Sequence, residues 1–240
     1  MKVRVFAGPN GSGKSTLIYS VDKGMKLNMG FIINADDIEN KLVSKNIYSF
    51  SKELIFDTKH LQHFLESSSL NKKYNLKTIA QKFTVEKSHI KISDNNGINS
   101  YVSAAIADFL RKECLKQKIN FSFESVFSDF RKVQFIKQLH ESGYEIYFYF
   151  VCTLNPSINI ARIKERVENA GHNVSEEKVK SRFQKSIQNA LRAKQYSKRF
   201  FLIDNSQENN PEILLETENN KTIKFINKTF YPEWAIPFSK

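Results

Sequence analysis

Short runs of apolar residues alternate along the chain with longer segments in which apolar residues recur every three or four positions. The short runs lie at residues 2–7, 30–34, 119–124, 144–153 and 200–203. Runs of this length, bounded by polar and turn residues, are typical of buried strands. Strands that alternate with helices predict right-handed βαβ units and a parallel sheet covered on both faces. We therefore expect an α/β three-layer sandwich with about five parallel strands.

The segments with helical spacing are interrupted by residues that commonly begin or end helices. Helices are predicted at residues 52–66, 76–87, 101–117, 129–142, 156–169 and 175–197. Gly143 follows one of them, Pro156 suits a first helical turn, and Ser175 followed by Glu176 and Glu177 resembles a capped start. Residues 213–226 alternate like a β-hairpin around a polar turn.

A glycine-rich segment follows the first apolar run and precedes a helical segment. Residues 8–15 read GPNGSGKS and fit G-x-x-x-x-G-K-[S/T] at every fixed position. Glycines let backbone N–H groups approach phosphate oxygens, and the helix that follows adds its partial positive charge. Lys14 is suited to neutralise the β- and γ-phosphates, and the Ser15 hydroxyl to face Mg²⁺. The alternative is a chance glycine-rich turn.

This motif predicts that the chain binds a nucleoside triphosphate, with Mg·ATP as the expected ligand. The residues assigned to the nucleotide are Gly8, Pro9, Asn10, Gly11, Ser12, Gly13, Lys14, Ser15 and Thr16.

The charge balance bears on the partner. The formal net charge of +12 suits anionic partners such as nucleotides, sugar phosphates or nucleic acid. The lysines are scattered, however, and none forms a long basic run. Nucleic acid therefore ranks behind a small-molecule acceptor as the expected partner.

Hydropathy and cysteine usage bear on the compartment. No run approaches the roughly 18 apolar residues that a membrane span needs, and the apolar start of the chain is too short for a signal peptide. We expect a soluble, cytoplasmic protein that does not bind membranes. Cys114 and Cys152 lie far apart without metal or redox spacing, which predicts two buried free thiols.

Two aspartates follow the second apolar run. In a doubly wound sheet, ligands bind at the carboxyl ends of the strands, so this position faces the phosphate site. A carboxylate there is suited to accept the proton of an attacking hydroxyl or to hold a Mg²⁺-bound water. The alternative role is a helix N-cap, which aspartate favours. We assign Asp36 to catalysis and to the metal, and Asp37 to the cap.

Glu124 ends the third apolar run. A single glutamate at the end of a buried strand is poorly explained by packing and better explained by a role on the substrate or on Mg²⁺; the alternative is a solvated loop carboxylate. Ser125 and Ser128 are candidates for further hydroxyl contacts to the substrate. Arg131 either reaches a substrate phosphate or pairs with a carboxylate.

Arginines mark a candidate lid over residues 162–182. Arg162 and Arg166 are four residues apart and share a helix face, and Arg182 lies on the next predicted helix. Phosphoryl transfer needs cations over the transferring group, and a closing lid supplies them. We assign Arg166 and Arg182 to this role, against the alternative of basic, solvent-facing helices.

The length of 240 residues suits one domain over residues 1–240. Residues 68–99, rich in Lys, Asn and Ser, are interpreted as an insertion with helical content beside the core. Residues 207–240 form a C-terminal extension.

Five motifs in a fixed order resemble the zeta-toxin family of P-loop kinases, and in particular its stand-alone bacterial predicted-ATPase branch. They are the glycine-rich segment, INAD at 33–36, FESVFS at 123–128, RVENAGHNV at 166–174 and IDNS at 203–206. The resemblance spans residues 2 to about 206. One departure is Ala170, where the family more often has glycine.

The resemblance implies a kinase fold with a five-stranded parallel core and transfer of the ATP γ-phosphate to a hydroxyl. In the best-known members the acceptor is a UDP-activated amino sugar, and the partner is an antitoxin protein. By motif, Lys14 and Ser15 hold phosphate and Mg²⁺, Asp36 is the base, and Glu124 is a carboxylate on the substrate side. Arg166 matches a lid arginine, with Arg182 as a second one.

Two other functions remain open from the residues. The positive charge, together with a weak helix-turn-helix pattern at residues 76–92, allows a polynucleotide kinase or another nucleic-acid-directed ATPase. An ATP-gated interaction module with residues 68–99 as its partner surface is the third. Neither explains Asp36, Glu124 and the arginines as well as a small-molecule kinase does.

Overall fold

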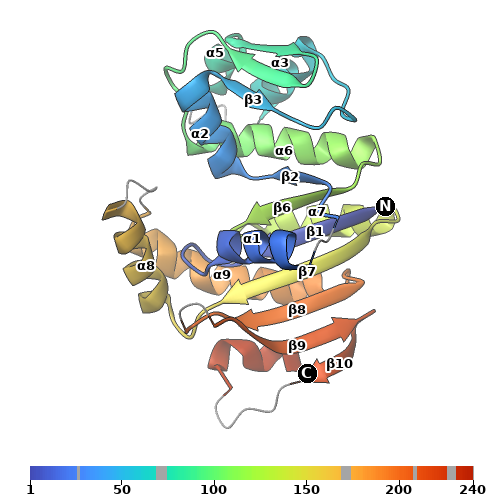
Figure 1. The fold of residues 1–240 in the computed structure, drawn as a ribbon, viewed down its shortest axis with the longest axis vertical. Coiled ribbons are helices and arrows are strands. Elements are labelled where there is room, and N and C mark those ends of the chain that lie inside the picture. The colour runs from blue at the N-terminus through green and yellow to red at the C-terminus, as the bar shows by residue number, and fades with distance from the viewer. Residues whose placement is uncertain (26–27, 69–74, 169–173, 208–209, 226–230, 240) are drawn as a thin grey trace. The chain divides into compact units, whose positions relative to one another are not determined.

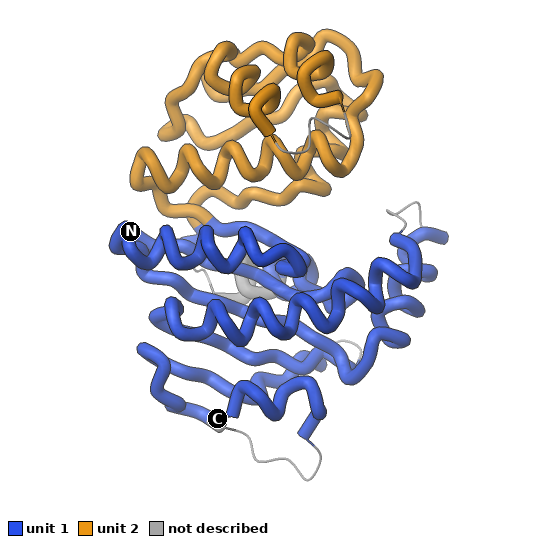
Figure 2. Tube along the Cα trace, turned by 180° about the vertical axis from the view of Figure 1, so that it is seen from behind, with its two compact units in different colours: residues 1–29, 122–240 blue, residues 30–121 orange. Residues whose placement is uncertain are grey.

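The computed structural model describes residues 1–25, 28–68, 75–168, 174–207, 210–225 and 231–239. The chain divides into two compact units (Figure 2). Unit 1 comprises Met1–Met29 and Ser122–Lys240, and unit 2 comprises Gly30–Phe121. Unit 2 therefore contains many more residues than the segment 68–99, which the sequence pattern marks as an insertion.

Unit 1 is built on a mostly parallel sheet, which confirms the α/β prediction. Its strands are β1 (Lys2–Ala7), β6 (Phe121–Ser125), β7 (Glu145–Cys152), β8 (Arg199–Asp204), β9 (Glu212–Glu218) and β10 (Lys221–Phe225). They lie in the order β10-β9-β8-β7-β1-β6. β1 and β8 flank β7 in parallel, whereas β9 and β10 are antiparallel and form the predicted hairpin.

Helices cover both faces of this sheet (Figure 1). They are α1 (Lys14–Met25), α7 (Phe130–Glu141), α9 (Glu176–Lys194) and the 3-10 helix η1 (Glu233–Ser239), while α8 (Pro156–Glu168) packs against α9 near the carboxyl ends of the strands. On one face Phe6, Tyr149 and Phe201 stack across β1, β7 and β8, with ring centroids 4.8 and 4.7 Å apart. On the other face Phe148 stacks on Phe200. These aromatic pairs fix the strands whose carboxyl ends carry the candidate site.

Two helices of unit 1 differ in how their first turns are capped. Asp129 caps α7, because its carboxylate accepts a hydrogen bond from the Arg131 N–H. Ser175 precedes α9 as predicted, but its side chain makes no capping hydrogen bond.

Unit 2 combines helices with a small antiparallel sheet. Its elements are β2 (Phe31–Ile33), α2 (Ala35–Lys45), β3 (Ile47–Ser49), α3 (Thr58–Ser67), α5 (Leu76–Ala80), β4 (Phe83–Glu86), β5 (His89–Ile92) and α6 (Ser100–Lys116). The sheet order is β3-β5-β4, and both pairs are antiparallel.

Two helix predictions in unit 2 were wrong in extent. The helix expected at residues 52–66 begins only at Thr58, because Asp57 caps it by accepting from the His60 N–H. Ile55, which seemed to belong to its apolar face, is 81% exposed. The backbone N–H and C=O of Ile55 are both bonded to the side chain of Gln117, which keeps this segment out of the helix.

The helix expected at residues 76–87 ends at Ala80 and is followed by a β-hairpin. The apolar residues alternate with polar ones through β4 and β5, and Lys87 in the two-residue turn adopts a left-handed φ of 53°. That alternation is the period of a strand and not of a helix. The helix-turn-helix interpretation of residues 76–92 is therefore wrong.

The two cysteines are buried and free, as predicted. Burial is the main cause that raises the pKa of the Cys114 thiol to about 12, and burial also raises the pKa of Cys152. Neither thiol is poised to react as a thiolate. Within the described ranges, no helix is both long enough and apolar enough to cross a bilayer.

Candidate nucleotide-binding site

The glycine-rich segment forms a tight loop between β1 and α1, as the motif predicts. Three of its glycines have positive φ: 152° at Gly8, 75° at Gly11 and 91° at Gly13. A Cβ at Gly8 would lie 2.0 Å from the Val151 carbonyl oxygen, and one at Gly11 would lie 2.6 Å from that of Asn159. Side chains do not fit there, so the loop exposes backbone to a ligand in the way a phosphate cradle requires.

Two asparagine side chains brace this phosphate-binding loop from outside. Asn159, fully buried in α8, donates from Nδ2 to the Asn10 carbonyl at 2.6 Å. Asn205 donates from Nδ2 to the Ser12 carbonyl at 2.8 Å. The Arg162 guanidinium in turn donates to the Asn205 carbonyl at 2.8 Å. Arg162 therefore helps to hold Asn205 in place, and it is not simply a basic residue on a solvent-facing helix.

Sequence reasoning missed Asn159 and included Asn205 only as part of the IDNS motif. One signal was available: an amide in the first turns of an amphipathic helix, at a position that packing would fill with an apolar residue, needs a buried hydrogen-bond partner. The identity of that partner, 149 positions away in the chain, is visible only in the fold.

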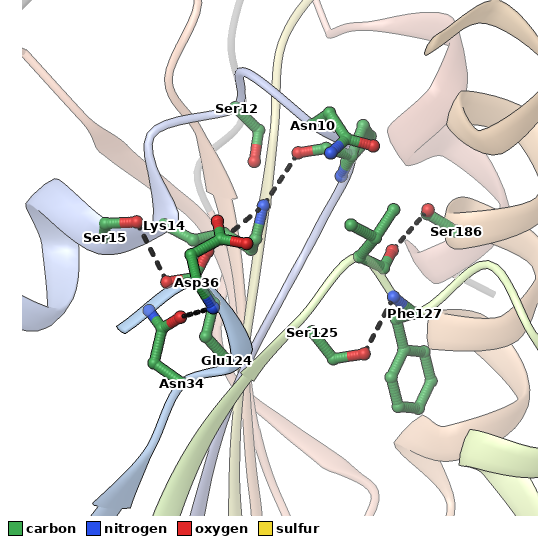
Figure 3. Close-up of polar contacts among 12 residues, drawn as sticks. Asn10, Ser12, Lys14, Ser15, Asn34, Asp36, Glu124, Ser125, Phe127 and Ser186 are labelled. Carbon is green, nitrogen blue, oxygen red and sulfur yellow. Dashed lines mark hydrogen bonds and ion pairs between the residues drawn. The ribbon is translucent and has the colours of Figure 1, made fainter. Parts of the chain in front are cut away.

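Lys14, Ser15 and Glu124 meet beneath the loop (Figure 3). The buried Lys14 ammonium donates to the Pro9 carbonyl at 2.9 Å and lies 3.7 Å from Glu124 Oε1. The Ser15 hydroxyl donates to Glu124 Oε2 at 2.9 Å. The Glu124 side chain is only 15% exposed. A carboxylate that bridges a buried lysine and a serine is not a solvated loop carboxylate.

These residues suit a Mg²⁺-bound triphosphate. The glycine cradle, the Lys14 charge and the start of α1 together match phosphate oxygens. The Ser12 hydroxyl, buried inside the loop, has no hydrogen-bond partner among the residues described. Mg²⁺ prefers oxygen ligands and is commonly held by one or two protein groups together with phosphates and water. Ser15 and Glu124 supply such oxygens side by side.

The loop after β6 is shaped by α9. Its Ser125 hydroxyl accepts from the Phe127 N–H at 3.1 Å, and Phe127 has a left-handed φ of 61°. Ser186 and Asn189 of α9 donate to the Val126 and Phe127 carbonyls. The Ser125 carbonyl accepts from the Gly8 N–H at 3.2 Å, which ties this loop to the phosphate-binding loop. Ser128 lies half-exposed on the same segment.

Arg131 pairs with a carboxylate, the second of the two roles that the sequence leaves open. Its Nε lies 3.0 Å from Asp129 Oδ2. This hydrogen bond is the main reason that the pKa of Asp129 lies below its usual range. The Arg131 side chain is 64% exposed.

The candidate lid is described only in part. Arg182 on α9 lies near the phosphate-binding loop, with its Nη1 3.4 Å from Asn10 Oδ1. Arg166 lies on the exposed side of the last turn of α8. The turn between them, with Ala170, Gly171 and His172, lies outside the described residues.

The two aspartates of unit 2 begin α2, but neither is its cap. Asn34 is the N-cap, because its side-chain oxygen accepts from the Asp36 N–H at 2.8 Å and from the Asp37 N–H at 3.3 Å (Figure 3). The capping role predicted for Asp37 is therefore wrong. Asn34 has the extended backbone that a cap needs, whereas Asp37 is already helical and pairs with Lys41 at 2.8 Å. The Asp36 carboxylate is exposed in the first turn.

Comparisons with known proteins agree with this fold. Residues 92–210 match the family model of the zeta toxins. A protein of Haemophilus influenzae with uncharacterized function is 36% identical over 69 residues, which are 29% of this chain and 49% of that protein. The match thus spans about half the length of that relative.

Solved structures with a similar fold include two of the AvrRxo1-ORF1:AvrRxo1-ORF2 complex. With ATP, the TM-score is 0.56 at 11% identity, over 99% of this chain and 62% of that one. With sulphate ions, the TM-score is 0.55 at 10% identity, over 92% and 60%. The PezAT toxin-antitoxin system of Streptococcus pneumoniae gives 0.52 at 13% identity, over 90% and 70%.

The sheet, the glycine-rich loop and these likenesses define a P-loop kinase fold. More particularly, the fold is zeta-toxin-like, and the match of residues 92–210 to the family model confirms the predicted resemblance to the zeta-toxin family.

Proposed function

We propose that this protein is an ATP-dependent phosphotransferase that moves the γ-phosphate to a hydroxyl group of a small molecule. The observation that carries the proposal is the Glu124 carboxylate between Lys14 and Ser15, under a loop whose glycines admit no side chain. This arrangement places one cation, one hydroxyl and one carboxylate where a metal-bound triphosphate needs them.

In this proposal the loop and Lys14 bind the β- and γ-phosphates. Ser15 and Glu124 are the residues that would hold Mg²⁺, which would supply positive charge beside the phosphates. Glu124 is thus assigned to the metal, one of the two roles that the sequence leaves open for it. The likeness to a complex solved with ATP supports the choice of nucleotide.

The remaining roles follow from residue type and place. Asp36 accepts the proton of the attacking hydroxyl, because its carboxylate is exposed at the start of α2. Arg182 and Arg166 neutralise charge on the transferring group, and the contact between Arg182 and Asn10 supports the first of these roles. Ser125 and Ser128 are assigned to the acceptor, because they lie on or next to the loop that follows β6, whereas Arg131 pairs with Asp129.

For the acceptor, the family resemblance favours a UDP-activated amino sugar. A protein antitoxin is the partner that we propose for this chain, since the likeness includes a toxin-antitoxin system and a two-protein complex. Nucleic acid is a weaker alternative, because the helix-turn-helix interpretation is replaced by the hairpin of β4 and β5.

The neighbouring aspartates of α2 provide a matched test of the proposed base. Asp36→Asn should retain Mg·ATP binding by calorimetry and lose transfer of the γ-phosphate, because the amide cannot accept the proton. Asp37→Asn, in the same helical turn, should retain both properties, since Asp37 pairs with Lys41. Full transfer by Asp36→Asn would remove Asp36 as the base. If wild-type protein did not bind ATP, the proposed phosphotransferase activity itself would be refuted.

A further inference from the structure

One side of α9 carries four polar residues at helical spacing, which we name the α9 stripe: Arg182, Ser186, Asn189 and Arg192. The first three contact the site or the loop after β6, and Arg192 contacts Phe130 at the start of α7. Arg182 Nη1 lies 3.4 Å from Asn10 Oδ1, and the Arg192 guanidinium lies 5.4 Å from the centre of the Phe130 ring. Between them, Ser186 Oγ lies 2.5 Å from the Val126 carbonyl oxygen. Asn189 Nδ2 lies 3.0 Å from the Phe127 carbonyl oxygen.

The middle of the stripe is buried. Ser186 is 0% exposed and Asn189 is 4% exposed. Burial of a hydroxyl or an amide is unfavourable unless it is hydrogen-bonded, and packing alone would place apolar side chains here. These two side chains instead bind two consecutive carbonyl groups about 60 positions earlier in the chain. The Asn189 amide binds the loop, so its contribution is specific to the conformation of that loop. The Ser186 hydroxyl has one proton and lies 2.5 Å from the Val126 carbonyl oxygen and 2.7 Å from the Arg182 carbonyl oxygen of its own helix, so its contribution to the loop is the smaller of the two.

The loop adopts a conformation that its sequence disfavours. Phe127 has a φ of 61°, in the left-handed region that bulky residues rarely occupy. Its ring is buried, with its centre 5.0 Å from that of Phe148. Such conformations persist only where the surroundings hold them firmly. Ser186 and Asn189 supply that hold from one side, and the buried ring supplies it from the other.

Glu124 lies immediately before this loop. The Ser125 carbonyl, between Glu124 and the two carbonyls that the stripe binds, accepts from the Gly8 N–H. The direction in which the Glu124 side chain leaves β6 therefore depends on a segment fastened both to the phosphate-binding loop and to α9. A shift of this segment would move the Glu124 oxygens away from Ser15 and Lys14.

We propose that Ser186 and Asn189 are positioning residues that fix residues 125–127 and, through them, hold Glu124 against Lys14 and Ser15. One part of this inference rests on the proposed function: if the protein binds Mg²⁺ and nucleotide, the two side chains set the affinity for Mg²⁺ in that complex. The conformation that they hold belongs to the loop itself and is measurable without nucleotide.

The test compares Ser186→Ala and Asn189→Ala with Gln188→Ala, an exposed neighbour on α9. Mn²⁺, used as a paramagnetic probe, is titrated by electron paramagnetic resonance into protein saturated with a non-hydrolysable ATP analogue. Each stripe variant should weaken Mn²⁺ binding about tenfold, as loss of supporting groups around metal ligands does. Binding of the analogue in EDTA should change less than about twofold, which is within ordinary non-additivity. Gln188→Ala should match wild type in both measurements.

A double-mutant cycle separates positioning from general damage. In a Glu124→Gln background the Ser186→Ala change should no longer weaken Mn²⁺ binding, because the group that it positions has lost its charge. Persistence of the full effect in that background would overturn the inference. Equal loss of analogue binding with and without metal would overturn it as well.

A second measurement distinguishes failure of this inference from failure of the proposed function. The Gly8 and Phe127 amides both donate hydrogen bonds to Ser125. Their hydrogen exchange should accelerate in Ser186→Ala and Asn189→Ala and not in Gln188→Ala. If wild-type protein binds no nucleotide, the proposed function fails and exchange alone decides the positioning role. Unchanged exchange at both amides would refute that role.

Discussion

Gly13 and Asn205 are predicted to be coupled, because one occupies the space that a side chain on the other would need. A Cβ at Gly13 would lie 2.1 Å from Asn205 Nδ2, the atom that donates to the Ser12 carbonyl. Gly13 also has a φ of 91°. Gly13→Ala therefore acts in two ways: it strains the backbone, and it displaces the amide that braces the phosphate-binding loop.

The two effects have separate magnitudes. The left-handed backbone conformation costs an alanine about 1–2 kcal/mol. Displacing the Asn205 amide loses one hydrogen bond, about 1 kcal/mol. Gly13→Ala should then lower the free energy of unfolding by about 2–3 kcal/mol, and Asn205→Ala by about 1 kcal/mol. In the Asn205→Ala background the clash is absent, so Gly13→Ala should cost only about 1–2 kcal/mol.

The single tryptophan provides the probe. Trp234 is buried in η1 of unit 1, so urea unfolding followed by its fluorescence reports on the unit that contains both residues. The double mutant should be more stable than the sum of the single changes predicts, by about 1 kcal/mol, which exceeds the usual error of additivity. Additive costs would show that Asn205 does not occupy the space beside Gly13, and would refute the assignment of this brace.

Three further outcomes are expected. Asn159→Ala removes the donor to the Asn10 carbonyl and the acceptor for the Thr153 hydroxyl, both buried, so the free energy of unfolding measured in urea should fall by about 2 kcal/mol; no change would contradict the bracing role. Glu124→Gln should abolish the gain in ATP affinity that Mg²⁺ provides in calorimetry, and an undiminished gain would remove Glu124 from the metal. Because Arg131 lowers the pKa of Asp129, this pair contributes to the free energy of unfolding above about pH 4, and the contribution is lost as the pH falls through the folded-state pKa. Arg131→Met should therefore raise the Asp129 pKa in an NMR titration and make the decrease of stability in acid smaller. An unchanged Asp129 pKa would contradict the pairing.

The parts of the fold that were predicted correctly depend on short-range signals. The glycine motif specifies its own turn, because its positive φ angles need glycine, and an apolar strand with Glu124 as its next-to-last residue specifies a carboxylate near the end of the sheet. The β9–β10 hairpin follows from alternation on either side of a polar turn.

The parts that were missed depend on competition or on distance. Asn34 and Asp37 are both good N-cap residues, and the choice between them depends on where the strand's extended backbone ends. Leu54 and Ile55 continue the spacing of α3, but the side chain of Gln117, 62 positions further along the chain, binds the Ile55 backbone and keeps this segment out of the helix. Asn159 and Asn205 act on carbonyls far along the chain, so their bracing role was invisible in a local pattern.

The most direct test of the central claim is transfer of label from γ-labelled ATP to a panel of acceptors. The panel contains UDP-sugars, free nucleosides, NAD, and DNA and RNA with free 5′-hydroxyl groups, and Lys14→Ala serves as the blank. A small-molecule kinase should place label on a small-molecule hydroxyl with wild-type protein and none with Lys14→Ala, because Lys14 is the buried cation of the phosphate-binding loop. Label confined to DNA or RNA, or ATP binding with label on none of the panel, would contradict a small-molecule kinase.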